Sequence, residues 1–259
     1  MPVAKKSPKA AKVAKKSPKA AKVAKKQSPK AAKVAKKQSS KTKTEQKKTD
    51  KEQKKDTTDP EPVKTTGRQP LPKRKNGALF FPDFPTFRPN LTPKQVLQKG
   101  SFGGTYFRPI SSTVTGKNYR NVHNEFPSEW FNGLDIKKNI TSEKCTPELN
   151  KYKVRAGSSL VAWEQSGWIK QQDPYGWFQW YCRFYMGRRT KDDQRQVDRW
   201  DNYAGLKRGR WRRNLVGKII KEGKSYNDPS VSPVIRQGLQ HWGFELKKKD
   251  FELSKAQRK

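Results

Sequence analysis

Aromatic side chains are confined to one part of this chain. All of its 12 Phe, 8 Trp and 8 Tyr lie between residues 80 and 251 of the 259 residues. The preceding segment is rich in Lys, Ala, Ser, Thr and Pro, and it cannot bury enough apolar surface to offset the entropy lost on ordering. We therefore expect a disordered repeat tail over 1–40, a disordered polar linker over 41–76, a folded Trp-rich domain over 77–251 and a disordered basic C-terminus over 252–259.

Residues that start and stop helices recur along the predicted domain. Three times, a side chain that can cap a helix precedes Pro, a favoured first helical residue, and Gly follows the run. The capping residues are Thr92, Asp173 and Ser232, and the runs end before residues 100, 187 and 243. Gln95 completes a capping box with Thr92. Capping residues and helical spacing predict three more helices, over 159–166, 191–204 and about 215–220.

Three other stretches complete the predicted fold. The run 177–186 is so apolar that its periodicity fits a strand as well as a helix, and the Asp-Pro before it and Gly after it favour a helix. Residues 101–112 contain several glycines and predict a loop or short hairpin. Residues 80–89 contain too many prolines for a helix or a central strand, so we expect an extended arm with aromatic anchors across the domain surface. The predicted fold class is mainly α, a single compact helical domain with this extended Pro/Phe-rich N-terminal arm, preceded by the long disordered basic tail.

Charge then suggests a partner. The chain has 60 Lys+Arg against 23 Asp+Glu, a formal net charge of +37, and its first acidic residue is Glu45. Before that residue, a Lys/Ala/Ser-Pro unit repeats from Val3, Val13 and Val23. Such a polycation favours a polyanionic partner, most commonly nucleic acid. The alternative is a solubilising or import-promoting tail without a dedicated target. The predicted phosphate contacts in the tail are Lys5, Lys6, Lys9, Lys15, Lys16, Lys19, Lys25 and Lys26.

Two further signals concern regulation and location. Ser7, Ser17 and Ser28 each precede Pro, and phosphorylation there would place negative charge beside the lysines. Near the predicted domain start, a short basic cluster resembles a nuclear import signal, and we expect a nuclear protein. That cluster is Pro72, Lys73, Arg74 and Lys75.

Cations also interleave with aromatic residues inside the predicted domain. Cations suit phosphate and exposed rings stack on bases, which together predict a nucleic-acid surface. The strongest local cluster is Lys207, Arg208, Arg210, Trp211, Arg212 and Arg213. Its alternative is a solvated basic loop. Mixed charges over 188–199 instead predict an internal lattice of salt bridges.

Signals for catalysis are weak. Cys145 and Cys182 fit no metal or redox spacing, and no cofactor motif is present. The only thiol–imidazole option pairs Cys182 with His123 or His241, yet Cys182 lies in the most apolar run, where thiols are usually inert. No apolar run is long enough for a membrane span. The tryptophans are expected to be mostly core, although a cage for methylated lysine would use similar residues. If the domain has a ligand pocket, its candidate residues are Arg236, Gln237 and His241.

Several motifs carry a resemblance. They are residues 102–110, residues 173–185, the stretch from 187 to 200, and residues 232–237 together with 241–243. They resemble a functionally uncharacterised Trp-rich family of fungi, plants and protists over about residues 80–250. The resemblance implies one ordered domain there and no particular activity or site residues. The repeats in the tail resemble the C-terminal tails of linker histones in composition only.

The sequence therefore favours a non-enzymatic, nuclear, nucleic-acid-associated protein, in which the tail binds phosphate without sequence preference. The domain would add a second basic surface or a surface for a protein partner. One alternative is a small-molecule-binding or catalytic domain with an accessory tail. Another is a protein-interaction scaffold in which the aromatic residues of 80–87 form an exposed ligand.

Overall fold

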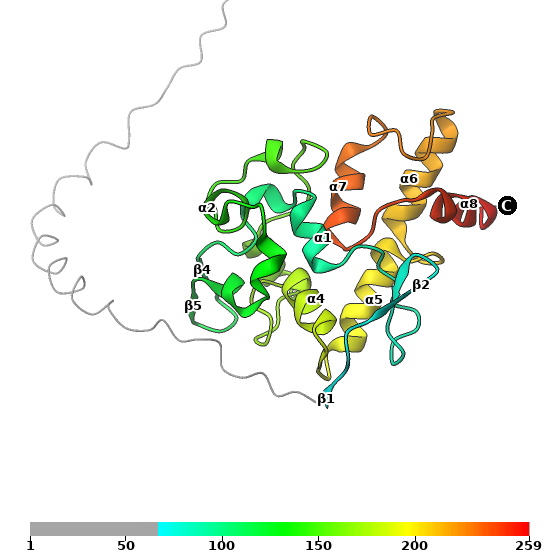
Figure 1. Cartoon of the computed structure of the whole chain (residues 1–259). Coiled ribbons are helices and arrows are strands. Elements are labelled where there is room, and N and C mark those ends of the chain that lie inside the picture. Colours follow the sequence, from blue (N-terminus) through cyan, green and yellow to red (C-terminus); the bar gives the residue numbers. More distant parts are fainter. Residues whose placement is uncertain (1–66, 259) are drawn as a thin grey trace, which may run out of the picture. The chain divides into compact units, whose positions relative to one another are not determined.

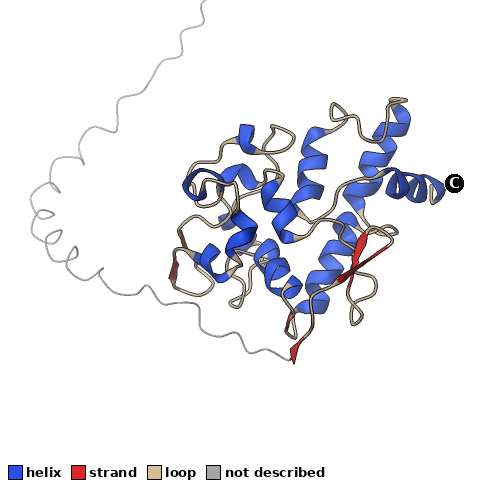
Figure 2. Ribbon diagram, in the orientation of Figure 1, coloured by secondary structure: helices blue, strands red, loops and turns tan. Residues whose placement is uncertain are grey.

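Helices form most of the regular structure in residues 67–258, which are the residues that the computed structural model describes. Within that range the chain forms eight α-helices and only short strands (Figures 1 and 2), which confirms a mainly α fold. The helices are α1 (Pro93–Gln98), α2 (Ile136–Asn139), α3 (Leu160–Gln165), α4 (Trp177–Tyr185), α5 (Asp193–Ala204), α6 (Arg210–Lys221), α7 (Pro233–His241) and α8 (Lys248–Ala256). The predicted tail, with its lysines and its three Ser-Pro sites, lies outside the described residues.

Three antiparallel strand pairs connect segments of the domain. The first pair, β1 (Gly67–Arg68) with β6 (Arg188–Arg189), joins the start of the described chain to the turn after α4. The second pair joins β2 (Lys73–Lys75) to β3 (Ala78–Phe80), and the third joins β4 (Ile110–Ser111) to β5 (Asn118–Tyr119). The third pair lies at the end of the stretch predicted to be a loop or short hairpin, which begins with a 3-10 turn over Phe102–Gly104.

The predicted helix starts were correct in part. The capping box of α1 is present, with Gln95 N–H donating to Thr92 Oγ1 at 3.1 Å and Thr92 N–H donating to Gln95 Oε1 at 3.0 Å. The run after Asp173 is a helix, but it begins at Trp177, because the Asp173 carboxylate binds arginine side chains instead of capping. α7 begins at Pro233 as predicted, although Ser232 provides no side-chain cap.

The arm is extended, but its rings belong to the core. Phe87 is completely buried, and its ring centroid lies 5.2–6.5 Å from those of five aromatic residues on α4 and α5. Phe81 is also buried and stacks on Phe87 at 5.2 Å. The expected course across the surface is therefore wrong for these two rings. Burial of so large a ring surface stabilises the arm on α4, and these side chains do not form an exposed ligand.

The folded domain extends beyond both of its predicted ends. Residues 67–76, assigned to the linker, hold β1 and β2, and Arg74 donates hydrogen bonds to the carbonyls of Gly77 and Asn90 at 3.1 Å. The C-terminus, predicted to be disordered after residue 251, continues as α8, and Ser254 is buried. The apolar content of these two segments did not indicate that they are ordered, because backbone pairing and hydrogen bonds from arginine side chains hold them on the domain.

Candidate nucleic-acid interface and ligand cavity

One groove on the described chain is strongly basic. It follows α6, encloses about 460 Å³ and is lined by eight residues, six of which are cationic. The cationic residues are Arg208, Arg210, Arg213, Lys218, Lys221 and Arg258, and Asn214 and Gly217 complete the lining. We call this feature the basic groove.

The two faces of α6 explain the groove. Leu215, Val216 and Ile219 point into the core and are completely buried. Residues 210, 213, 217 and 221 follow at helical spacing on the opposite face, so their side chains lie in one row. Gly217 leaves room for Arg258, because a Cβ there would lie 2.9 Å from its guanidinium. Arg258 also donates to the carbonyl of Arg213 at 2.8 Å, so the C-terminal residues complete the groove.

Arg212 does not belong to this surface. Its side chain is 4% exposed, and its Nε donates to Ser254 Oγ at 2.8 Å while Nη2 donates to the carbonyl of Asp250 at 3.0 Å. It also lies over the ring of Phe244 at 4.8 Å. Burial lowers the pKa of Arg212. This residue therefore fastens α8 to α6, and its predicted contact with nucleic acid is wrong.

The other predicted residues of the cluster remain near the groove. Arg208 and Arg210 line it, whereas Lys207 is exposed outside its lining. Trp211 is half-buried, with its ring 6.0 Å from that of Tyr203. Sequence reasoning missed Lys218, Lys221 and Arg258. Helical spacing from Arg210 could have indicated the two lysines, but no local signal connects residue 258 to α6.

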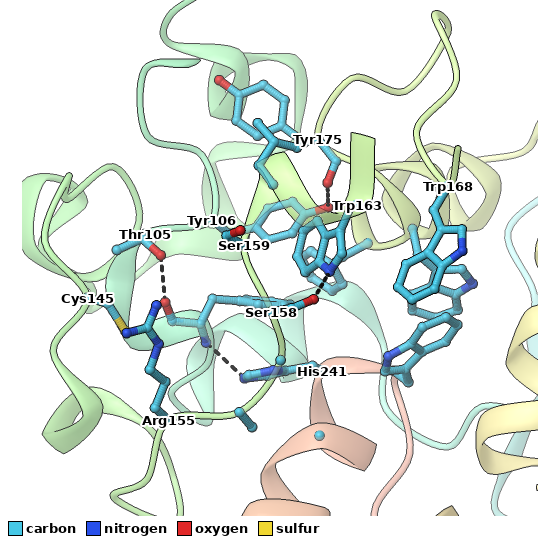
Figure 3. A pocket seen from close by; sticks show the side chains of 18 of the residues that line it. Thr105, Tyr106, Cys145, Arg155, Ser158, Ser159, Trp163, Trp168, Tyr175 and His241 are labelled. Carbon is cyan, nitrogen blue, oxygen red and sulfur yellow. Dashed lines mark hydrogen bonds between the residues drawn. The ribbon is translucent and has the colours of Figure 1, made fainter. Parts of the chain in front are cut away.

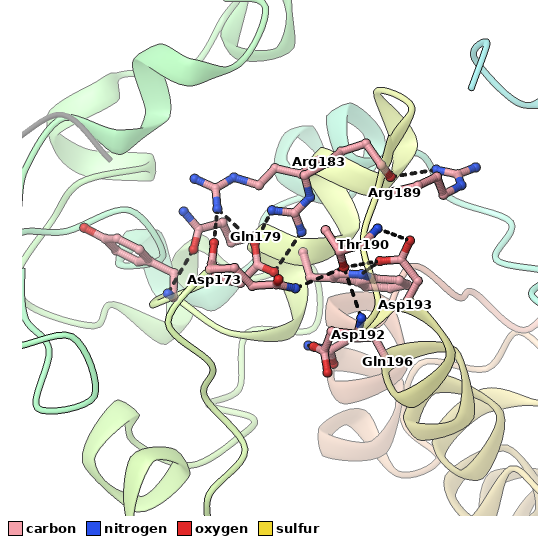
Figure 4. A network of polar contacts seen from close by, with 12 residues as sticks. Asp173, Gln179, Arg183, Arg189, Thr190, Asp192, Asp193 and Gln196 are labelled. Carbon is pink, nitrogen blue, oxygen red and sulfur yellow. Dashed lines mark hydrogen bonds and ion pairs between the residues drawn. The ribbon is translucent and has the colours of Figure 1, made fainter. Parts of the chain in front are cut away.

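The arginines of 188–199 do form salt bridges as predicted, but some of their acidic partners lie outside that range of the sequence (Figure 4). Asp173 is 1% exposed and binds two arginines, Arg183 at 2.9 Å and Arg188 at 2.9 and 2.8 Å. Arg183 also makes a two-point ion pair with Glu125 at 2.5 and 2.6 Å. Burial alone would lower the pKa of Arg183, but the hydrogen bonds that it donates to Glu125 and the negative charge of Asp173 outweigh burial and raise that pKa. These arginines are engaged within the fold, so they are poorly placed to bind phosphate.

A second concave site has a different character. It is a cavity of about 350 Å³ between α3, α4, α5 and α7, and we call it the aromatic cavity. Figure 3 shows Trp163, Trp168 and His241 turned toward the same space, with Arg155 and Cys145 on the side away from Trp168. Its principal lining residues are Phe102, Tyr106, Trp163, Trp168, Trp177, Phe178, Tyr203, His241 and Trp242, with Arg108, Arg155, Arg199 and Glu143 as the charged members.

The predicted pocket residues are separated by the fold. His241 lines the aromatic cavity, whereas Arg236 and Gln237 do not. Arg236 donates to the carbonyls of Val231 and Tyr226, both at 2.9 Å, and so holds the turn before α7. Gln237 is completely buried, and its Oε1 accepts the backbone N–H of Tyr152 at 3.0 Å.

His241 is held as a neutral acceptor. Its Nε2 accepts the backbone N–H of Phe102 at 2.9 Å and lies 3.0 Å from the amide nitrogen of Gln237. Its ring stacks on that of Phe102 at 4.1 Å. Burial lowers the pKa of His241 to about 3. Because Nε2 accepts both bonds, the proton of the neutral ring lies on Nδ1.

The candidate thiol is not activated. Cys182 is completely buried on α4, and burial raises its pKa. A thiol needs a lowered pKa to act as a nucleophile. Cys182 also does not line the cavity that contains His241, so that cavity does not hold the thiol and the His241 imidazole together.

Comparisons with family models, curated proteins and solved structures find no match to this chain. Within residues 67–258, no helix is both long enough and apolar enough to cross a membrane. The same residues contain no group of three or more His, Cys, Asp or Glu placed to hold a metal ion. The class that fold and sites define is a mainly α domain with an aromatic core, one basic groove and one aromatic cavity.

Proposed function

We propose that this protein is a non-enzymatic, nuclear, nucleic-acid-associated protein whose basic groove binds the phosphate backbone. The observation that carries the proposal is the convergence of six cations in one groove. The Lys-rich tail supplies further sequence-independent affinity, because every phosphate that a cation neutralises releases condensed counterions. The short basic cluster that ends at Lys75 acts as the import signal.

The charge balance of the groove supports this function. Among the described residues, Arg208 is the only groove cation with a carboxylate oxygen inside 4 Å, Asp201 Oδ2 at 3.6 Å. Elsewhere in the domain, arginines such as Arg183 and Arg189 have close acidic partners. The groove cations therefore keep a positive potential that attracts a polyanion.

The groove is suited to phosphate more than to base recognition. Four of its six cations are on the exposed face of one helix, and two of them are lysines, which act as point charges on flexible stems. Such contacts position a nucleic acid without reading its sequence. We expect binding to tolerate sequence changes and to weaken steeply with salt.

The test measures how binding of the full chain to duplex DNA and single-stranded RNA depends on salt. A groove variant carries Arg210→Gln, Arg213→Gln, Lys218→Gln and Lys221→Gln. A control variant loses the same charge at exposed lysines outside the groove, with Lys137→Gln, Lys138→Gln, Lys144→Gln and Lys191→Gln. Each lost phosphate contact reduces the slope of log K against log salt by about 0.9 for duplex DNA.

For duplex DNA we expect the groove variant to lose up to about 3.6 units of that slope and the control variant to lose less than about one. Equal slopes for the two variants would refute the groove as the interface and leave the tail to explain the binding. Full-length protein is preferable to a fragment that starts at residue 77, because such a fragment lacks β1 and β2.

A further inference from the structure

The aromatic cavity has a wall of stacked rings. Trp242 stacks on Trp177 at 4.4 Å on one side and on Tyr203 at 4.6 Å on the other. Trp163 is half-buried and Trp168 is 46% exposed, so these two indoles, expected in the core, line the cavity instead. Exposed indoles on a concave surface provide flat apolar area for a planar ligand.

Arg199 places a cation on this wall. Its guanidinium lies 5.5 Å from the ring centroids of both Trp168 and Trp242. It donates to Gln196 Oε1 at 2.9 Å, and within the described residues no carboxylate oxygen lies within ion-pair distance of it. Arg195, one turn earlier on α5, is by contrast paired with Asp192 at 2.5 Å.

This arginine remains charged. Burial and the charge of Arg195 lower the pKa of Arg199 to about 10, which still leaves it protonated at neutral pH. A partly desolvated cation without a counter-ion is unfavourable, and an anion that reaches it recovers part of that free energy. Arg108 and Arg155 also line the cavity, against one carboxylate, that of Glu143.

We propose that the aromatic cavity binds a planar aromatic ring that carries an acidic group, with the ring against the accessible indoles of Trp163 and Trp168 and the acidic group on Arg199. Both halves of the ligand are needed. A neutral ring would leave Arg199 without a counter-ion, and a small anion would leave the indoles in water. The site is separate from the basic groove, so it stands independently of the proposed nucleic-acid binding.

The same charges exclude the methyl-lysine cage. Aromatic cages bind quaternary ammonium groups because the ring faces are negative. Here the Arg199 guanidinium already lies 5.5 Å from the ring centroids of Trp168 and Trp242, and its positive charge repels a second cation. The neutral ring of His241 adds a donor at Nδ1 and no acidic group.

The test titrates the full chain by calorimetry with four probes. Indole-3-acetate and adenosine 5′-monophosphate represent two sources of the shared chemistry, an aromatic carboxylate and a nucleotide. Tryptamine keeps the indole and reverses the charge, and acetate lacks the ring. We expect at least one ring-bearing anion to bind at least about tenfold more tightly than tryptamine and acetate, because a charged hydrogen bond and a stacked ring contribute that much each.

Two variants and two controls locate the binding. Arg199→Gln should weaken the bound anion about tenfold or more, and Trp168→Leu should weaken it several-fold. Arg195→Gln, on the same helix, should leave affinity within about twofold, because its cation is already paired. The groove variant described above should also retain binding, which separates this cavity from adventitious phosphate binding in the groove.

Clear outcomes oppose the proposal. It is overturned if neither ring-bearing anion binds, if tryptamine binds as tightly as the tighter of the two ring-bearing anions, or if Arg199→Gln and Arg195→Gln have the same affinity for that anion. Thermal unfolding of each variant confirms that the fold is retained. Trp168→Leu is a safe probe in this respect, because 46% of that side chain is exposed.

Discussion

Acid should destabilise this domain through one buried histidine. His241 is 6% exposed, and its Nε2 accepts the backbone N–H of Phe102. Protonation would turn that acceptor into a donor facing another donor, inside a site that already disfavours charge. In the unfolded chain the same ring titrates near pH 6.5.

The size of the effect follows from the two pKa values. The folded protein holds the pKa of His241 at about 3, so between pH 6.5 and pH 3 the unfolded chain carries a proton that the folded chain does not. Stability from this group is therefore complete above the unfolded pKa and declines as pH falls below it. Between pH 7 and pH 5 the loss is about 2 kcal/mol, from about 1.36 kcal/mol per unit of pKa difference.

The assay is urea unfolding at pH 7, 6 and 5, followed by tryptophan fluorescence. His241→Gln removes the titration and retains an oxygen that can accept the Phe102 N–H. We expect the unfolding free energy of the wild type to fall about 2 kcal/mol more than that of His241→Gln between pH 7 and pH 5. His123→Gln is the comparison, because burial lowers the pKa of His123 too, but that ring is only partly buried. If wild type and His241→Gln lose equal stability, the reasoning is refuted.

Two further substitutions test the packing. Phe87→Ala should lower the unfolding free energy by about 3–5 kcal/mol, because the removed ring is completely buried among six other aromatic rings, and Phe84→Ala should cost clearly less at its half-buried position. Equal losses in denaturant unfolding would contradict the placement of the arm. Gly187→Ala should destabilise by more than about 1 kcal/mol, since its φ is +98° and a Cβ would lie 2.0 Å from the Gln69 carbonyl oxygen. Gly133→Ala is its control, with φ +77° and open space, and hydrogen exchange near β1 should increase only in Gly187→Ala.

Local signals predicted the helices well where the deciding contacts are local. The capping box of α1 needs only residues 92 and 95, and it forms as predicted. α4 is a helix as the flanking Asp-Pro and Gly indicated, yet its start shifted by three residues. That shift has a tertiary cause, because the carboxylate of Asp173 is bound by Arg183 and Arg188 and is not available as a cap.

The candidate sites were less predictable. The sequence identified the basic cluster at the start of α6 but could not separate Arg212, which is buried against α8, from Arg213, which lines the groove. These neighbours differ by about 100° around the helix, and which face is buried depends on residues 38–42 positions away. The aromatic cavity had no local signature, because its walls come from four separate helices and from the segments that connect distant parts of the chain, such as 102–108 and 143–159.

The sequence by itself determined that this protein has a large excess of basic residues, that its aromatic residues lie after residue 79, and that the part they occupy is mainly α. Composition and short-range spacing suffice for those features, since they depend on neighbours along the chain. Only the tertiary structure decided that the Phe/Pro arm is core, that α8 completes the basic groove, and that Arg199 lies on the indoles of a cavity. Those features depend on contacts between residues far apart in the sequence, which become neighbours only when the aromatic core has packed.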